Sequence, residues 1–127
     1  MPTGHSPPPG RPRIVVVGPC ASGKTTLVNG LRNHGYDALV SGQEHSDIHY
    51  LWRRSSPDVV IGLDITLEEI RQRRADEEWP AWLYARQQDR LRDAMAAADL
   101  VIDTTSAEAS QVLAQSLAYL ADHSGSS

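Results

Sequence analysis

The part of this 127-residue chain best suited to chemistry is the stretch GPCASGKTT, residues 18–26. It follows a short apolar run, Ile14 to Val17, and it contains the chain's only lysine, Lys24. The spacing Gly-x-x-x-x-Gly-Lys-Thr matches the loop GxxxxGK[ST], whose backbone N–H groups surround phosphate oxygens. A strand before the loop and a helix after it are the required context. We therefore expect a nucleotide phosphate site formed by Gly18, Pro19, Cys20, Ala21, Ser22, Gly23, Lys24, Thr25 and Thr26.

Each residue type in this loop has a physical task. Glycine lets the backbone turn tightly and approach an anion, and the hydroxyl of Thr25 can bind Mg²⁺. Lysine suits position 24 because a compact ammonium fits between phosphate oxygens, where a planar guanidinium presents a wider fork. A redox role is conceivable for Cys20, but we expect it to be a small residue that fills the loop.

Composition excludes several other classes of function. The formal net charge is −4, so we expect no specific nucleic-acid partner and no anionic membrane surface. A single cysteine cannot form an internal disulfide, which fits a reducing compartment. No apolar run approaches the roughly 20 residues of a membrane span, and the amino terminus has no signal pattern. We expect a cytoplasmic protein.

The chain divides into one predicted domain, residues 13–122, between two tails. Residues 1–12 are rich in proline and glycine, and residues 123–127 are small and polar. We therefore expect both segments to be disordered. Strands are predicted at 14–17, 36–40, 58–64 and 100–103. Helices are predicted at 24–34, 47–54 and 67–74, then from Pro80 to about residue 98, and after a capping box at Thr105 and Glu108. A second capping box pairs Thr66 with Glu69.

Apolar strands thus alternate with amphipathic helices. This order predicts an α/β three-layer sandwich, with a short parallel sheet of about 4–5 strands covered by helices on both faces. Ligands in such sheets bind at the carboxyl ends of the strands, where Glu44, Asp64 and Asp103 are expected. Glu44 is our first choice for a base or for the Mg²⁺ shell. Asp64 is the alternative metal carboxylate with Thr25, and Asp103 suits a turn.

Several phosphate-binding classes are excluded by missing features. Guanine-reading GTPases need an Asn/Thr-Lys-x-Asp motif, and this chain has no second lysine. Motor ATPases of the RecA type need a longer core. The stretch VSGQ, residues 40–43, imitates an ABC transporter signature, but Ile65 stands where that family's catalytic glutamate would follow Asp64.

What remains resembles the small-molecule and nucleotide kinase branch of P-loop NTPases, which includes shikimate, gluconate, nucleoside and nucleoside-monophosphate kinases. The resemblance is carried by the GPCASGKTT loop, by DVVIGLDITLEEIRQRR at 58–74 and by ADLVIDTT at 98–105. The segment GQEHSDIHYLWRR, residues 42–54, also looks like short bacterial P-loop proteins of unassigned function. The resemblance implies the P-loop NTPase fold, ATP as phosphoryl donor with Mg²⁺, and a small-molecule phosphoryl acceptor.

In this branch a mobile lid brings arginines onto the phosphates. By resemblance the candidates are Arg71, Arg73 and Arg74, with Arg86 and Arg90 on the next helix. The catalytic residues that we predict are Lys24, Glu44, Asp64, Arg71 and Arg74. Only residues 42–57 are available for the usual acceptor-binding insertion. The acceptor pocket is therefore small, supplied by a partner subunit, or lost.

The remaining polar and aromatic candidates stay open at this stage. His45 and His49 are four residues apart and favour acceptor binding over a metal site, since no third ligand is visible. Trp52 suits the core. Trp79 and Trp82 could cover adenine or pack at an interface, together with the alanine-rich stretch 94–98, in a homodimer. We expect an Mg-ATP-binding kinase. The alternatives are a regulatory nucleotide-binding module without catalysis and an oligomeric NTPase.

Overall fold

The computed structural model describes residues 12–124. Residues 1–11 and 125–127, most of the two predicted tails, lie outside the described residues. The last helix runs on through His123, so the structured part extends into the predicted carboxyl-terminal tail. The elements in order are β1 (Arg13–Val17), α1 (Lys24–Asn33), β2 (Asp37–Val40), the 3₁₀ turns η1 (Gln43–His45) and η2 (Leu51–Ser55), β3 (Val59–Asp64), α2 (Leu67–Arg74), α3 (Ala81–Ala97), β4 (Leu100–Asp103) and α4 (Ala109–Ser124).

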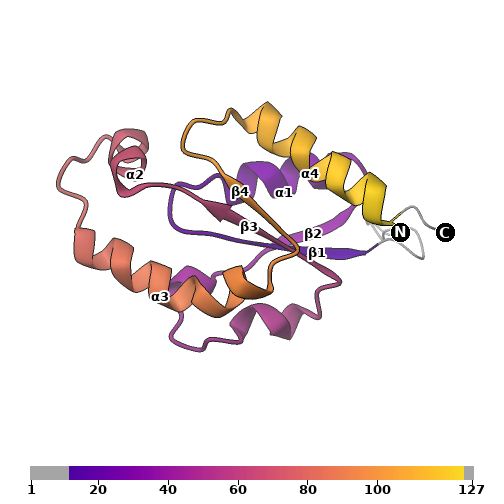
Figure 1. Ribbon diagram of the computed structural model, residues 1–127, viewed down its shortest axis with the longest axis horizontal. Helices are drawn as coiled ribbons and strands as arrows, with labels where there is room; N and C mark the ends of the chain where they lie inside the picture. The colour runs from indigo at the N-terminus through magenta and orange to yellow at the C-terminus, as the bar shows by residue number, and fades with distance from the viewer. Residues whose placement is uncertain (1–11, 125–127) are drawn as a thin grey trace, which may run out of the picture.

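The strands form one parallel sheet of four in the order β2-β1-β3-β4, which confirms the predicted α/β class (Figure 1). Val15 of β1 pairs with Leu39 on one side and with Val60 on the other. The chain leaves β1 toward β2 and leaves β3 toward β4, in opposite directions across the sheet. The carboxyl ends of β1 and β3 therefore border a topological switch point, where ligands bind in such sheets.

Both faces of the sheet are covered (Figure 1). Ile14 and Val16 pack with residues of α1 and α4, whereas Val15 and Val17 pack with Trp52 and with residues of α3. Successive strand residues point to opposite faces, so a central strand between two helical layers must be apolar at every position. This explains the uninterrupted run at residues 14–17.

The capping pattern predicted the start of α2 but not the start of α4. Half of the Thr66 box is confirmed: Thr66 Oγ1 accepts from the backbone N–H of Glu69 at 3.2 Å, whereas the Glu69 carboxylate pairs with Arg73 and does not cap Thr66. The Thr105 box is wrong, because Thr105 Oγ1 instead accepts from the backbone N–H of Thr66 at 3.1 Å and joins two loops. α4 begins later, at Ala109, and the side chain of Gln111 caps the N–H of Glu108 at 2.8 Å.

The segment between β2 and β3 also departs from expectation. A helix was predicted over 47–54, whereas the structure has only the short turns η1 and η2. Gln43 holds this segment together, because its amide donates to the carbonyl of Ile48 and accepts from the N–H of Trp52. Trp52 is buried, as predicted. Within residues 12–124, no helix combines the length and apolar character needed to cross a membrane.

Candidate functional site

The Gly18–Thr25 loop links β1 to α1 at the switch point. Gly18 and Gly23 of its motif are each required to be glycine for a different physical reason. A Cβ on Gly18 would lie 2.7 Å from both the carbonyl oxygen of Leu63 and the hydroxyl of Ser22. Gly23 has a φ of 95°, a left-handed conformation that glycine adopts without steric cost. The loop therefore packs against β3 at its start and turns sharply into α1 at its end.

The amino terminus of α1 is open to an anion. Gly23 occupies the N-cap, no side chain caps the helix, and the first turn contains no acidic residue. The first N–H groups of a helix have no intrahelical acceptor, and they carry a partial positive charge. Thr25 and Thr26 are exposed in this first turn. The arrangement suits phosphate oxygens.

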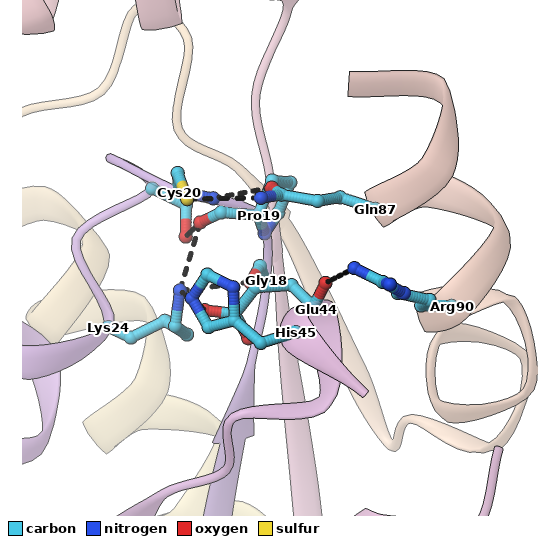
Figure 2. Close-up of polar contacts among 9 residues, drawn as sticks. Gly18, Pro19, Cys20, Lys24, Glu44, His45, Gln87 and Arg90 are labelled. Atoms are coloured by element: carbon cyan, nitrogen blue, oxygen red, sulfur yellow. Dashed lines mark hydrogen bonds and ion pairs between the residues drawn. The ribbon is translucent and has the colours of Figure 1, made fainter. Parts of the chain in front are cut away.

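Lys24 is held over the loop by three acceptors (Figure 2). Its Nζ lies 2.9 Å from the carbonyl oxygens of Gly18 and Pro19, and 2.9 Å from Oε2 of Glu44. The two side chains of the ion pair are only 10% and 5% exposed. An ammonium has three N–H donors in a compact group, so this position makes use of the properties that distinguish lysine from arginine.

Glu44 comes from η1, just after the strand that pairs with β1. One carboxylate oxygen, Oε2, contacts Lys24 and lies 3.4 Å from Nε2 of His45. The other, Oε1, is buried and has no hydrogen-bond partner among residues 12–124. A buried carboxylate oxygen without a donor is costly. Oε1 is therefore suited to a ligand that brings a hydroxyl, a bound water or a cation.

The other two acidic candidates have local partners. Asp64 is exposed at the end of β3, where its Oδ1 accepts from the N–H of Ile65 at 2.9 Å and lies 3.5 Å from the Gln88 amide. Within the described chain, none of these hydrogen bonds reaches the Gly18–Thr25 loop. Hydrogen bonds from the hydroxyl and backbone N–H of Thr105 lower the pKa of Asp103. Asp103 is thus a turn residue, as its sequence context indicated.

The arginine of α2 that reaches the loop is Arg73. Its guanidinium donates to the carbonyl oxygens of Ala21, at 2.9 Å, and Thr104, and it pairs with Glu69. Arg71 turns instead to the carbonyl of Trp79, and Arg74 lies over the ring of that tryptophan. Trp79 in turn packs in one cluster with Cys20 and Ala21, so Arg71 and Arg74, the pair that we preferred, contact a neighbour of the loop, and among the described residues neither forms a hydrogen bond with the loop itself.

Two of the three arginines of α3, Arg86 and Arg90, contact the segment after β2. Arg90 Nε lies 2.8 Å from Asp47, and Arg86 lies 3.8 Å from the same carboxylate. Arg90 also donates to the backbone carbonyl of Glu44 at 3.3 Å (Figure 2). His49 lies 3.3 Å from Asp93, whereas His45 lies 3.4 Å from Glu44. These contacts anchor η1, and with it Glu44, to α3.

A cavity of about 240 Å³ adjoins the loop on the side of α4. Residues of the loop and of α1, Arg73 of α2, residues of the segment after β4 and two residues of α4 line it. Its lining includes Ser22, Gly23, Thr26, Arg73, Thr104 and Ala107. Neither Trp79 nor Trp82, which we considered for covering adenine, lines it.

Trp79 belongs to a small core cluster with Ile65 and Ile70, whereas Trp82 is 65% exposed. Ala94, which we considered for a subunit interface, is fully buried against the sheet. Ala94 is thus already used within the monomer, whereas Ala96, Ala97 and Trp82 are exposed.

One contact of the loop was missed by sequence reasoning. Gln87 of α3 is 1% exposed, and its side-chain amide forms two hydrogen bonds with Cys20, each 3.1 Å long (Figure 2). The available signal was a glutamine within the apolar stripe of α3, between Leu83 and Leu91. A polar residue in an otherwise apolar stripe needs a hydrogen-bond partner when it is buried, and here that partner is Cys20.

No protein-family model matches this chain, and no curated protein shows significant similarity to it. Within residues 12–124, no group of three or more His, Cys, Asp and Glu side chains is arranged to hold a metal ion. A functional assignment therefore depends on the geometry of the Gly18–Thr25 loop and its surroundings.

Proposed function

We propose that this protein binds Mg-ATP at the Gly18–Thr25 loop and transfers the γ-phosphoryl group to a small-molecule acceptor. The observation that carries the proposal is the buried Lys24–Glu44 pair beside the uncapped start of α1. It supplies a cation for the terminal phosphates and, 2.9 Å away, a carboxylate with one oxygen that has no hydrogen-bond partner in the described part of the chain. Phosphoryl transfer needs both kinds of group.

On the donor side, the first-turn amides of α1 and Lys24 would bind the phosphates, and the purine base would enter the cavity beside the loop. Arg73 lines that cavity and is 2.9 Å from the loop carbonyl of Ala21, so it would adjoin both the base and the phosphates of a bound nucleotide. Adenine is the expected base because the chain lacks the motif that reads guanine.

Mg²⁺ fits the residues present. Hard oxygen ligands suit this ion, and it usually keeps several waters and a few protein oxygens. The hydroxyl of Thr25 and the unpartnered Oε1 of Glu44 meet that requirement, the latter directly or through water. The ion would neutralise charge on the transferred phosphoryl group. Asp64 is the second carboxylate candidate, at the end of the neighbouring strand.

On the acceptor side, a hydroxyl oxygen would attack the γ-phosphorus as the bond to the β–γ bridging oxygen breaks, and ADP would leave with that electron pair. Glu44 Oε1 can orient this hydroxyl and receive its proton, provided the carboxylate is not occupied by metal. The remainder of catalysis would come from positioning and from charge stabilisation by loop amides and Lys24.

A regulatory nucleotide-binding module is the second candidate, and one observation favours it. The segment available for an acceptor site is filled by its own side chains, since Gln43 is fully buried and bonded to Ile48 and Trp52. Such a module would bind ATP without acceptor-stimulated turnover.

Two measurements separate these functions. Calorimetric titration with ATP and ADP, with and without Mg²⁺, tests binding, and Lys24→Met should abolish it. ADP release across a panel of nucleosides, nucleoside monophosphates, sugar acids and polyols tests transfer. Arg54→Met, which changes an exposed basic residue in η2, is the matched control. Absence of ATP binding by the unmodified protein would rule out both functions.

A further inference from the structure

We propose that Gln87 is a positioning residue of the nucleotide site, which holds the turn at Cys20 and Ala21 in the conformation that phosphate binding needs. This inference rests on the proposed function, because it assigns a role within the same site. Gln87 lies in the middle of α3, 67 residues from Cys20 along the chain, and it is 1% exposed.

Both polar atoms of the Gln87 side chain form hydrogen bonds with the same loop residue, Cys20. Oε1 accepts from the backbone N–H of Cys20, and Nε2 donates to its Sγ (Figure 2). Pro19 has no N–H, so the amide of Cys20 is the first that the loop offers after Gly18. Gln87 therefore directs this amide toward α3 and fixes the backbone at the point where the loop turns.

The residue that follows is strained. Ala21 has a φ of 63°, the left-handed region that residues with a Cβ seldom occupy. Such a conformation persists only where neighbouring groups hold it. Gln87 holds the N–H of Cys20 on one side of Ala21, and Arg73 binds the Ala21 carbonyl at 2.9 Å on the other. Side chains from α3 and α2 thus hold the strained residue from both sides.

Packing alone does not account for a glutamine at this position. The residues of α3 that share its face, Leu91 and Ala94, are apolar and fully buried. A buried amide is tolerated only when it is hydrogen-bonded, and both bonds of Gln87 go to Cys20. An apolar side chain would fill the same space in a core, so the amide points to a role at the loop.

The test uses Gln87→Met, which keeps the length of the side chain and removes both hydrogen bonds. We expect Mg-ATP to bind about tenfold more weakly, the loss typical of one or two hydrogen bonds. Adding Ala21→Gly should restore most of the affinity, because glycine adopts a positive φ without the strain that Gln87 opposes. Gln115→Met, an exposed position of α4, is the control and should bind like the wild type.

A second readout needs no nucleotide. Cys20 is the only cysteine, so the rate of its alkylation by iodoacetamide reports on this turn alone. Gln87→Met should raise that rate severalfold. Gln87→Leu removes the same two hydrogen bonds with a shorter apolar side chain and should raise the rate in the same way, which also covers the case in which Gln87→Met does not fold.

The outcomes distinguish the two proposals. A wild-type protein that binds no nucleotide overturns the proposed function. Wild-type binding, with Gln87→Met equal to Gln115→Met in affinity and alkylation rate, overturns the role of Gln87. A loss of affinity that Ala21→Gly does not restore also overturns it, because Gln87 would then support the core of the protein and not the strained turn.

Discussion

Lys24 and Glu44 form a buried ion pair, with Nζ and Oε2 2.9 Å apart and side chains 10% and 5% exposed. The pair joins the loop after β1 to the turn after β2, which lies beside it in the sheet. A buried charge is tolerated mainly when it is paired with an opposite charge. Removal of one partner therefore leaves the other charge buried and uncompensated, which destabilises the fold. The central cation of the candidate site therefore also affects the stability of the fold.

The first prediction concerns that stability. Lys24→Met should lower the free energy of unfolding by about 3 kcal/mol, because it leaves the Glu44 carboxylate buried beside an apolar side chain. The double variant Lys24→Met with Glu44→Gln should recover most of this loss, since neither charge remains. Urea denaturation monitored by tryptophan fluorescence measures both. Strictly additive effects of the two changes would show that the pair is not coupled.

The second prediction assigns the carboxylate. Glu44→Gln should lower acceptor-dependent ADP release by about a hundredfold or more, the usual effect of losing a catalytic acid–base group. Asp64→Asn should lower it by less than about tenfold, because Asp64 is exposed and bonded to Ile65 and Gln88. Steady-state kinetics at saturating Mg-ATP compares them. A larger effect of Asp64→Asn would transfer the role to Asp64.

The third prediction separates the arginines of α2. Arg73→Gln should weaken ATP binding by about tenfold, because Arg73 lines the cavity and contacts the loop at Ala21. Arg71→Gln loses only a bond to the Trp79 carbonyl and should change affinity by less than about threefold. Calorimetric titration of both, with Arg54→Gln as a control, decides whether the loop contact matters. Equal effects would favour a general electrostatic contribution.

The fourth prediction tests the close approach of the loop to β3. Gly18→Ala would place a Cβ 2.7 Å from the Leu63 carbonyl oxygen and should cost about 1–3 kcal/mol of unfolding free energy through overpacking. Gly42→Ala is the matched control, because nothing lies within 4 Å of its added Cβ. Thermal unfolding of the two variants gives the comparison. A Gly18→Ala variant as stable as Gly42→Ala would contradict the packing described above.

The fifth prediction concerns pH. The guanidinium of Arg90 holds the pKa of Asp47 below its usual value of 3.8. A carboxylate whose pKa is depressed by folding stabilises the fold above its unfolded pKa, and this contribution is lost as the pH falls through the folded pKa. The anchor between α3 and η1 should therefore persist at neutral pH and weaken below pH 3.8.

An NMR titration of the Asp47 carboxyl checks this directly. Arg90→Gln should move its midpoint up toward the usual value, and Arg92→Gln, at an exposed position of the same helix, should not. An unchanged midpoint in Arg90→Gln would show that the pair does not form in solution.

The sequence by itself determined the features that depend on neighbouring residues. The glycine spacing 18–23 predicted the loop between strand and helix, and the Thr66 box predicted the start of α2. The continuous apolar run 14–17 predicted a central parallel strand. Each of these signals is local, because turn geometry, helix capping and strand burial are properties of a few consecutive residues.

Only the tertiary structure decided which distant side chains meet at the loop. Thr105 looked like a helix cap, but it binds Thr66 from another loop. Arg73 reaches the loop, whereas its neighbours on α2 turn toward Trp79. Glu44 pairs with Lys24 because their strands are adjacent, and Gln87 reaches Cys20 because α3 packs across β1 and β3. The direction of a side chain follows from helix rotation and strand order, and both are set by packing of the whole core.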